Sequence, residues 1–185
     1  MQPVAKVVLL NGVGSSGKSS IARALQDILD EPYLHVQMDA FLDMLPERLQ
    51  DSPHAFSYEV SEESGRPLVA IACGPVGQRL LAGMRCAIAA MAEQGNNLIV
   101  DDVTCYGEMP EYVRLLSPCR LHLVGVLAPL DVLEARERER GDRLLGLARW
   151  QYERVHRDIR YDLEVDTSVA TPLECARLIR DRFRL

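Results

Sequence analysis

The feature that most constrains this chain is the run Gly12-Val13-Gly14-Ser15-Ser16-Gly17-Lys18-Ser19, which fits the phosphate-loop pattern G-x-x-x-x-G-K-[ST]. The apolar run Lys6–Leu10 before it predicts a buried strand, and Ser19–Leu29 after it has the apolar spacing of a helix. Glycines let such a loop wrap closely around a polyphosphate with its backbone N–H groups pointing inward. The pattern predicts that Lys18 reaches the β- and γ-phosphates of a nucleotide, and that the Ser19 hydroxyl joins the shell of a Mg²⁺ ion.

The same loop also contains the dinucleotide-binding pattern G-x-G-x-x-G, formed by Gly12, Gly14 and Gly17. Asp39 lies 22 residues after Gly17, where a dinucleotide-binding domain needs an acidic residue for the ribose. The consecutive Lys18-Ser19 favours the phosphate loop, and 185 residues leave little room for a dinucleotide fold with a substrate domain. A glycine turn that binds no ligand is the third interpretation.

Strand and helix patterns alternate along most of the chain. After the phosphate loop, strands are predicted at Tyr33–Met38, Asn97–Val100, Arg120–Leu127 and Leu163–Val165, and helices at Phe41–Leu49 and Leu173–Phe183. The polar segment Gln50–Pro67 is predicted to be a loop with a small hairpin at Phe56–Val60. Because strands separated by helices imply parallel crossovers, we expect a three-layer α/β/α fold around a mostly five-stranded parallel sheet. Nothing marks a boundary, so residues 1–185 are expected to form one domain.

Acidic residues follow two of the predicted strands, at the edge where open α/β sheets bind ligands. One of Asp101 and Asp102 is expected to hold Mg²⁺, directly or through water, and a helix cap or an exposed turn is the alternative. Asp39 is expected opposite the phosphate loop, where a carboxylate could accept the proton of an attacking hydroxyl. Its alternative role is to cap the helix predicted at Phe41–Leu49.

Arginine and glutamate crowd the segment Glu134–Arg143, within a long helical stretch, Ala128–Arg157, that is predicted to break at Gly141. One interpretation is a solvated helix stabilised by i,i+4 ion pairs. These pairs would be Glu134 with Arg138 and Glu139 with Arg143. The other interpretation is a mobile lid, because planar arginines meet the charge of a transferring phosphoryl group with paired hydrogen bonds. In a lid, Arg140 and Arg143 are the residues expected to contact phosphate.

Charge and cysteine content exclude several classes of protein. The net charge of −6 argues against a broad basic surface for nucleic acid. The apolar run Val4–Leu10 is too short to span a bilayer, so no membrane association and a cytoplasmic location are expected. The five cysteines form no C-x-x-C pair, so reduced thiols are expected in place of disulfides or a zinc site. The histidines are scattered and expected to be structural; they are His35, His54, His122 and His156.

Beyond these motifs, the sequence resembles the chloramphenicol phosphotransferase family of small phosphate-loop kinases. The resemblance is carried by Leu9–Ser19, Glu31-Pro32, Met38-Asp39, Val100–Val103, Arg136–Arg143, Val155-His156, Tyr161–Thr167 and Glu174–Ala176. It covers nearly the whole chain and is weakest over Gln50–Gly77. It implies an adenylate-kinase-like phosphate-loop fold with a helical lid at about residues 129–157. It also implies that Gly12–Ser19 holds ATP and that an aspartate base stands at Asp39.

These observations lead to the hypothesis of an ATP- and Mg²⁺-dependent kinase that phosphorylates a hydroxyl of a small molecule. The acceptor stays open, because the resemblance is weakest where its pocket would be partly built. A nucleoside, a sugar acid and an antibiotic such as chloramphenicol, with a role in resistance, all fit. The other classes are a nucleotide switch, for which an N-K-x-D guanine reader is missing, and a dinucleotide-dependent oxidoreductase. Formation of a homo-oligomer is also left open.

Overall fold

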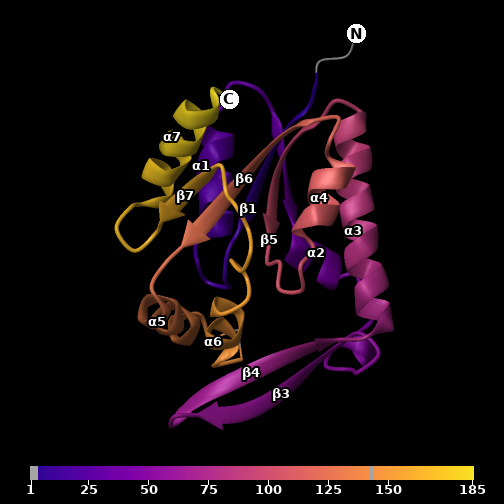
Figure 1. Cartoon of the computed structure of the whole chain (residues 1–185), viewed down its shortest axis with the longest axis vertical. Coiled ribbons are helices and arrows are strands. Elements are labelled where there is room, and N and C mark those ends of the chain that lie inside the picture. The colour runs from indigo at the N-terminus through magenta and orange to yellow at the C-terminus, as the bar shows by residue number, and fades with distance from the viewer. Residues whose placement is uncertain (1–3, 142–143) are drawn as a thin grey trace.

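A parallel sheet forms the centre of the computed structural model, of which we describe residues 4–141 and 144–185. Its five strands run in the order β2-β5-β1-β6-β7 (Figure 1). They are β1 (Lys6–Asn11), β2 (Tyr33–Gln37), β5 (Asn97–Asp102), β6 (Arg120–Leu127) and β7 (Leu163–Asp166). With helices on both faces, this sheet confirms the predicted three-layer α/β/α fold.

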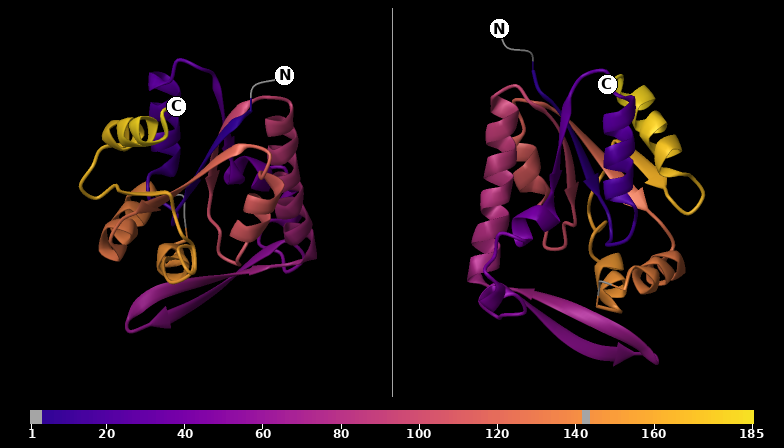
Figure 2. Two further views of the ribbon diagram at one scale, coloured as in Figure 1. Left: turned by 45° about the horizontal axis from the view of Figure 1, so that its top comes forward. Right: turned by 180° about the vertical axis from the view of Figure 1, so that it is seen from behind.

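Helices cover both faces of the sheet, and each face has its own apolar core. α3 (Pro75–Glu93) and α4 (Met109–Leu115) lie on one face, and α1 (Lys18–Ile28) and α7 (Pro172–Phe183) on the other (Figures 1 and 2). Successive residues of a strand point to opposite faces. On β5, Leu98 and Val100 therefore pack in the α3 and α4 core, and Ile99 packs in the α1 and α7 core. This two-sided burial explains why the strands are apolar along their whole length.

The strand order separates two interpretations of the glycine-rich loop. β1 lies between β5 and β6, and β2 is an edge strand beyond β5. In the dinucleotide-binding fold the strand order is 3-2-1-4-5-6, so its second strand lies beside its first. The strand order of this sheet differs from that one, so the fold gives no support to a dinucleotide site. The register pairs Leu10 with Asp101 and Asn11 with Asp102, so both acidic residues lie level with the start of the loop.

The segment after β2 differs from the single helix predicted at Phe41–Leu49. The helix α2 (Met38–Leu42) begins earlier and has little more than one turn, and a separate turn of 3₁₀ helix, η1, covers Glu47–Leu49. The predicted helix is wrong because Pro46, which has no N–H to donate, lies between the two and is the N-cap of η1. As a result Asp39 lies in the first turn of α2 and does not cap a longer helix.

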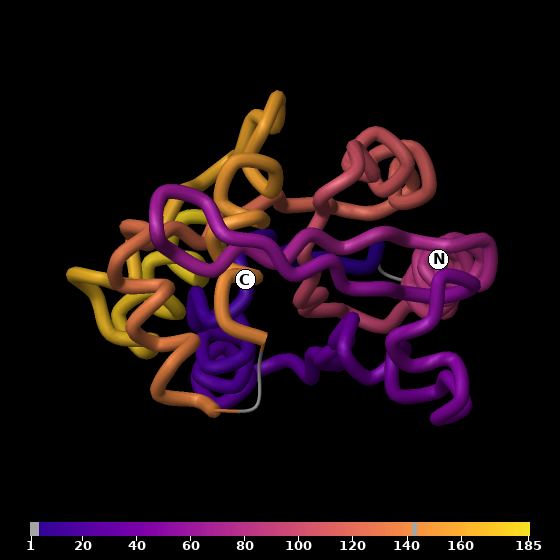
Figure 3. Tube along the Cα trace, turned by 90° about the horizontal axis from the view of Figure 1, so that it is seen from below, coloured from indigo at the N-terminus to yellow at the C-terminus, as the bar shows by residue number. Residues whose placement is uncertain are grey.

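A long antiparallel hairpin follows in place of the loop predicted at Gln50–Pro67. Its strands are β3 (Phe56–Glu63) and β4 (Arg66–Cys73), so the small hairpin predicted at Phe56–Val60 is only its beginning. The hairpin leaves the N-terminal end of α3 and crosses beneath the sheet toward α6 (Leu147–Tyr152) (Figures 1 and 3). It therefore forms one side of the space below the carboxyl ends of the parallel strands.

Two short helices lie in the segment predicted to be a lid, and we call this segment the lid. α5 (Leu130–Arg140) ends at Gly141, where the break was predicted, and α6 (Leu147–Tyr152) follows. Arg143 lies outside the described residues, so its predicted contact with phosphate stays a prediction. No helix in the described part of the chain is long and apolar enough to cross a membrane.

The lid and the hairpin are joined at the first residues of α6. Glu137 is buried on α5, and its carboxylate accepts hydrogen bonds from the backbone N–H groups of Gly146 and Ala148, both at 2.8 Å. These bonds satisfy donors that the start of α6 would otherwise leave unpaired. The carbonyl of Gly146 accepts a hydrogen bond from the N–H of Val69 on β4 at 3.1 Å. A Cβ at Gly146 would lie 2.4 Å from the backbone oxygen of Pro67, so only glycine permits this approach.

Candidate active site

The phosphate loop Gly12–Ser19 connects β1 to α1 at the carboxyl edge of the sheet. A Cβ at Gly12 would lie 2.5 Å from the backbone oxygen of Val126 and 2.8 Å from Oγ of Ser16, so the loop can pass beside β6 only with glycine there. Gly17 is the N-cap of α1, and no side chain caps this helix end. The start of α1 is therefore a site where backbone N–H groups and the helix dipole favour an anion.

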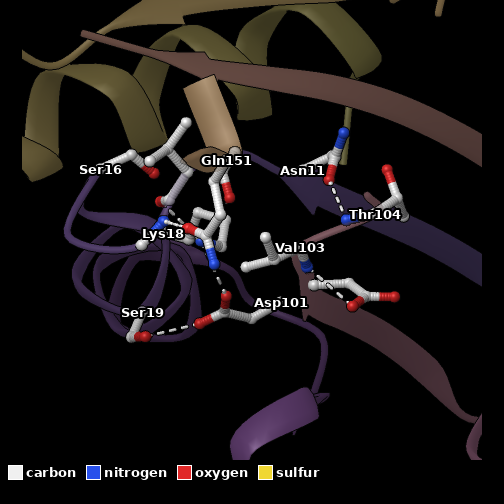
Figure 4. Close-up of polar contacts among 12 residues, drawn as sticks. Asn11, Ser16, Lys18, Ser19, Asp101, Val103, Thr104 and Gln151 are labelled. Carbon is white, nitrogen blue, oxygen red and sulfur yellow. Dashed lines mark hydrogen bonds and ion pairs between the residues drawn. The ribbon is translucent and has the colours of Figure 1, made fainter. Parts of the chain in front are cut away.

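Lys18, Ser19 and Asp101 meet directly below this loop (Figure 4). Lys18 is buried, and its ammonium group donates to the carbonyls of Gly12 at 2.9 Å and Val13 at 3.1 Å. The same nitrogen lies 3.8 Å from Oδ1 of Asp101, whose Oδ2 accepts a hydrogen bond from the Ser19 hydroxyl at 2.5 Å. His35 on β2 also faces this carboxylate, with Nε2 at 3.6 Å from Oδ2.

The surroundings of Asp101 favour its charged form. Burial alone would raise the pKa of Asp101, but His35, Lys18 and Ser19 outweigh burial and hold the pKa below its usual range. The ionised carboxylate and the Ser19 hydroxyl provide two oxygens of the kind that Mg²⁺ prefers. In the described part of the chain, no group of three or more His, Cys, Asp or Glu side chains could hold a metal ion. Phosphate oxygens would therefore have to complete a magnesium shell at this point.

Asp102 points to the opposite face of the sheet. Its carboxylate accepts hydrogen bonds from the Tyr112 hydroxyl at 2.5 Å and from the N–H of Val103 at 2.7 Å. Burial raises the pKa of Asp102, although these two hydrogen bonds oppose the rise. The structure therefore brings Asp101, and not Asp102, to the predicted magnesium site, and Asp102 instead connects β5 to α4.

A cavity of about 580 Å³ opens beside the phosphate loop and collects most of the predicted site residues. Its walls include Lys18, Ser19 and Asp101, together with Asp39 from α2. They also include three arginines: Arg23 of α1 and Arg136 and Arg140 of α5. Cations from the loop, from α1 and from the lid thus surround one space, although the chain as a whole is acidic. This arrangement suits a ligand that carries several phosphates.

A second cavity, of about 610 Å³, adjoins the first. It lies between α2, the segment 43–51, the start of β3 and the lid. Asp39 and Arg140 are the two residues that line both cavities, so they stand at the boundary between them. The chain therefore has two ligand-sized spaces that meet at a carboxylate and a guanidinium group.

Two residues near the phosphate loop, Arg136 and Gln151, were not among the predicted site residues. Arg136 donates to the Thr167 hydroxyl at 2.9 Å and to the Thr167 carbonyl at 2.7 Å, and the Thr167 hydroxyl donates to the carbonyl of Ser16 at 2.9 Å. Gln151 of α6 is buried, and its Oε1 accepts a hydrogen bond from the N–H of Gly14 at 2.7 Å (Figure 4). Arg136 stood out as part of an arginine-rich segment, whereas no sequence signal marks Gln151.

Glu134 shows that the lid is more than a solvated helix. Its carboxylate pairs with Arg149 of α6 and, at 3.5 Å, with Arg66 of β4, in place of the pairing with Arg138 that the spacing suggested. Because Arg149 and Glu134 are both largely buried, this pair connects the two lid helices. The contacts of Glu134 therefore differ from those of a solvated helix, and the lid interpretation stays a prediction.

Asn11, at the end of β1, connects the loop to distant segments, and its replacement by leucine is expected to destabilise the fold. Its side-chain amide donates to the Val155 carbonyl at 2.8 Å and the Tyr161 hydroxyl at 2.7 Å, and its oxygen accepts from the N–H of Thr104 at 3.0 Å. Because Asn11→Leu removes the partner of the buried Val155 carbonyl and of the Thr104 N–H, we expect the free energy of unfolding to fall by about 2–4 kcal/mol. Urea unfolding measures this change.

Asn96→Leu is the matched control for this variant, because Asn96 is exposed and, in the described part of the chain, its side chain donates only to the nearby Met91 carbonyl. We expect this control to change the free energy of unfolding by less than about 0.5 kcal/mol. A similarly small change for Asn11→Leu would contradict the structural role given to Asn11.

Comparison with known proteins shows which family the chain belongs to. A family model described as chloramphenicol phosphotransferase-like protein matches residues 5–184. The chain belongs to this family. A proposed O-phosphotransferase from Mycobacterium tuberculosis is 32% identical to the chain, and the match covers 98% of this chain and 84% of that protein. The chloramphenicol phosphotransferase-like family was the one that the sequence motifs resembled, so the predicted resemblance is confirmed.

Solved structures support the fold of this chloramphenicol phosphotransferase-like protein. The APS kinase CysC of Mycobacterium tuberculosis, in complex with AMPPNP and APS, has a TM-score of 0.68 at 16% identity and covers 99% of both chains. Shikimate kinase from Acinetobacter baumannii, in complex with shikimate, has a TM-score of 0.59 at 14% identity, covering 97% of this chain and 93% of that chain. At such low identity these likenesses show the fold alone. Together with membership of the family, the phosphate-loop kinase fold makes the chain a phosphotransferase of the kinase type.

Proposed function

We propose that this chain transfers the γ-phosphate of ATP to a hydroxyl group of a small molecule. The observation that carries the proposal is the meeting of two cavities at Asp39 and Arg140. The cavity with the phosphate loop suits the nucleotide, and the adjoining cavity suits the acceptor. A two-substrate transfer needs such neighbouring spaces, because the attacking oxygen must reach the phosphorus of the other ligand.

In this proposal Asp39 accepts the proton of the acceptor hydroxyl while its oxygen forms a bond to the γ-phosphorus. The bond between that phosphorus and the bridging oxygen of ATP breaks, and ADP and a phosphate ester are the products. Lys18 and Arg140 stabilise the negative charge on the transferring group. Such transfer depends mainly on positioning and charge stabilisation, so the placement of these side chains around one space matters most.

Mg²⁺ fits the oxygen atoms beside the loop, where Asp101 and the Ser19 hydroxyl would hold it together with phosphate oxygens. When bound, the ion would neutralise part of the phosphate charge. Thr167 and Arg136 would hold the lid against the loop through their contacts with each other and with Ser16. The cytoplasm is the favoured place of action, because it supplies ATP and keeps thiols such as those of the five free cysteines reduced.

Thermal unfolding tests the nucleotide half of the proposal. With ATP and Mg²⁺ at about one hundred times the dissociation constant, we expect stabilisation by about 2.7 kcal/mol. For a chain of this size that corresponds to a rise in Tm of roughly 5–10 °C. Selective stabilisation by NADH or NADPH would contradict the proposal, and a response to GTP with Mg²⁺ alone would favour a nucleotide switch.

The part of the proposal that concerns the acceptor is tested by a direct search for the alcohol that is phosphorylated. A screen of hydroxyl-bearing metabolites, nucleosides, sugar acids and amphenicols should reveal at least one alcohol that raises ATP consumption, and mass spectrometry should show its phosphate ester. Chloramphenicol belongs in this screen because of the family, and its phosphorylation would connect the chain to antibiotic resistance. The second cavity favours a kinase over a switch, since a switch has no need of an acceptor space beside the phosphate loop.

A further inference from the structure

The second cavity, which we call the acceptor cavity, has one apolar wall. Leucines from the segment after β2 and from the lid form most of it, and two aromatic side chains at the start of β3 complete it. These residues are Leu42, Leu45, Leu49, Phe56, Tyr58 and Leu147. A cavity of about 610 Å³ with such a wall suits a compact organic molecule with apolar surface.

The polar residues of the acceptor cavity are mainly acidic. Asp43 and Asp51 line it in addition to Asp39, whereas Arg140 is the only cation among the described residues that line it. Arg140 lies at the boundary with the phosphate-loop cavity, so Asp43 and Asp51 supply the charge of the part that only the acceptor would occupy.

These two carboxylates lie at separate places, and both residues are exposed. Asp43 is the residue at which α2 ends. Asp51 has a positive φ of 50°, and its Oδ1 accepts a hydrogen bond from the N–H of Tyr58 at 3.3 Å. The carboxylate of Asp51 is therefore attached to the base of β3, beside the aromatic part of the apolar wall.

The two cavities differ in charge in a way that matches two different ligands. Three carboxylates line each cavity, but the phosphate-loop cavity also has four cationic side chains among its described lining residues: Lys18, Arg23, Arg136 and Arg140. The acceptor cavity shares only Arg140 with that set. A carboxylate or sulfate on the acceptor would meet Asp43 and Asp51 and be repelled, whereas an ammonium group would be attracted.

We infer that the acceptor is a hydroxyl-bearing amine with an apolar body, and that Asp43 and Asp51 select it over neutral and acidic alcohols. This inference rests on the proposed phosphotransfer and adds the substrate class. The apolar body packs on the leucine and aromatic wall, the ammonium group lies toward the two carboxylates, and the hydroxyl reaches Asp39. Asp43 and Asp51 are thus specificity residues that do not touch the reacting atoms.

A set of acceptor alcohols that share one carbon skeleton and differ in charge tests the inference. The panel contains phenylserinol and related aromatic amino alcohols, each as the free amine, the neutral N-acetyl form and the acidic N-succinyl form. We expect kcat/KM for the best amine to exceed that of its N-acetyl form at least about fivefold, with the N-succinyl form lower still. The full-length protein with ATP and Mg²⁺ is used throughout.

Asp43→Asn and Asp51→Asn then remove one charge each while keeping the side-chain size. Asparagine tolerates the positive φ at residue 51 and keeps an oxygen for the N–H of Tyr58, so this variant is expected to fold. In the double variant we expect the preference for the amine to shrink to about twofold or less. Asp27→Asn is the control, because Asp27 is exposed on α1 and lines neither cavity; its preference should equal that of the unchanged chain.

The outcomes separate this inference from the proposed function. If neutral or acidic alcohols are phosphorylated as well as or better than the amines, the inference is overturned and the phosphotransfer stands. If the amine preference persists in the double variant, Asp43 and Asp51 are not its source and the inference is again overturned. If ATP consumption rises with no alcohol of any charge, the proposed function itself fails.

Discussion

Replacing Lys18 by alanine is expected to lower kcat about 10³-fold. Lys18 is buried, held by the Gly12 and Val13 carbonyls and 3.8 Å from Asp101, so its ammonium group has a fixed place below the loop. A fixed cation in a largely dry site stabilises developing phosphate charge far more than a mobile one in water. Steady-state ATP consumption with the best acceptor measures the loss.

The chain offers one matched control, because Lys6 is its only other lysine. Lys6 begins β1, at the opposite end of that strand from the loop, and pairs with Glu31 at 3.0 Å. Lys6→Ala should keep kcat within about twofold of the unchanged chain, since surface ion pairs contribute about 1 kcal/mol or less to stability. If Lys18→Ala and Lys6→Ala had equal activity, the role of Lys18 in phosphotransfer would be disproved.

Asp39→Asn is expected to lower kcat by about 10²–10⁴ and to leave the stabilisation by ATP and Mg²⁺ largely intact. Asparagine has nearly the same shape as aspartate but does not accept the acceptor's proton. Asp39 lines both cavities, so it is the carboxylate that a hydroxyl in one and a phosphate in the other would both approach. Single-turnover measurements with saturating acceptor separate this loss from a change in binding.

Asp27→Asn serves as the control here as well, because it makes the same chemical change on the exposed side of α1. Retention of near-normal kcat by Asp39→Asn with the true acceptor would remove the general-base role. Positioning by Lys18 and Arg140 would then account for the transfer, as a loose phosphoryl transition state allows.

The sequence could predict much of the fold because its signals were local. The first apolar strand, the glycine-rich loop and the helix after it lie within the first thirty or so residues and need no distant partner to be recognised. The choice between Asp101 and Asp102 was different. Strand alternation places them on opposite faces, but which face carries α1 depends on the packing of the whole sheet.

Long-range contacts explain what the sequence did not predict. Gln151 reaches Gly14 across 137 residues, and His35 reaches Asp101 through the pairing of β2 with β5. The hairpin was predicted only in part because apolar and polar residues alternate over Phe56–Val60 but not over the exposed rest of β3. The acceptor cavity, built in part by the start of this hairpin and by the lid, was therefore the least predictable part of the site.

The close approach at Gly146 affects how such a chain can change its acceptor during evolution. The hairpin and the lid share a backbone hydrogen bond there, with no space for a side chain between them. An insertion that shifted β4 would therefore shift the start of α6, and with it Gln151 and its bond to the phosphate loop. New acceptors are more readily reached by exchanging side chains on the cavity wall than by changing the length of the hairpin. Relatives with different acceptors should thus keep the hairpin length and differ at positions such as Asp43 and Asp51.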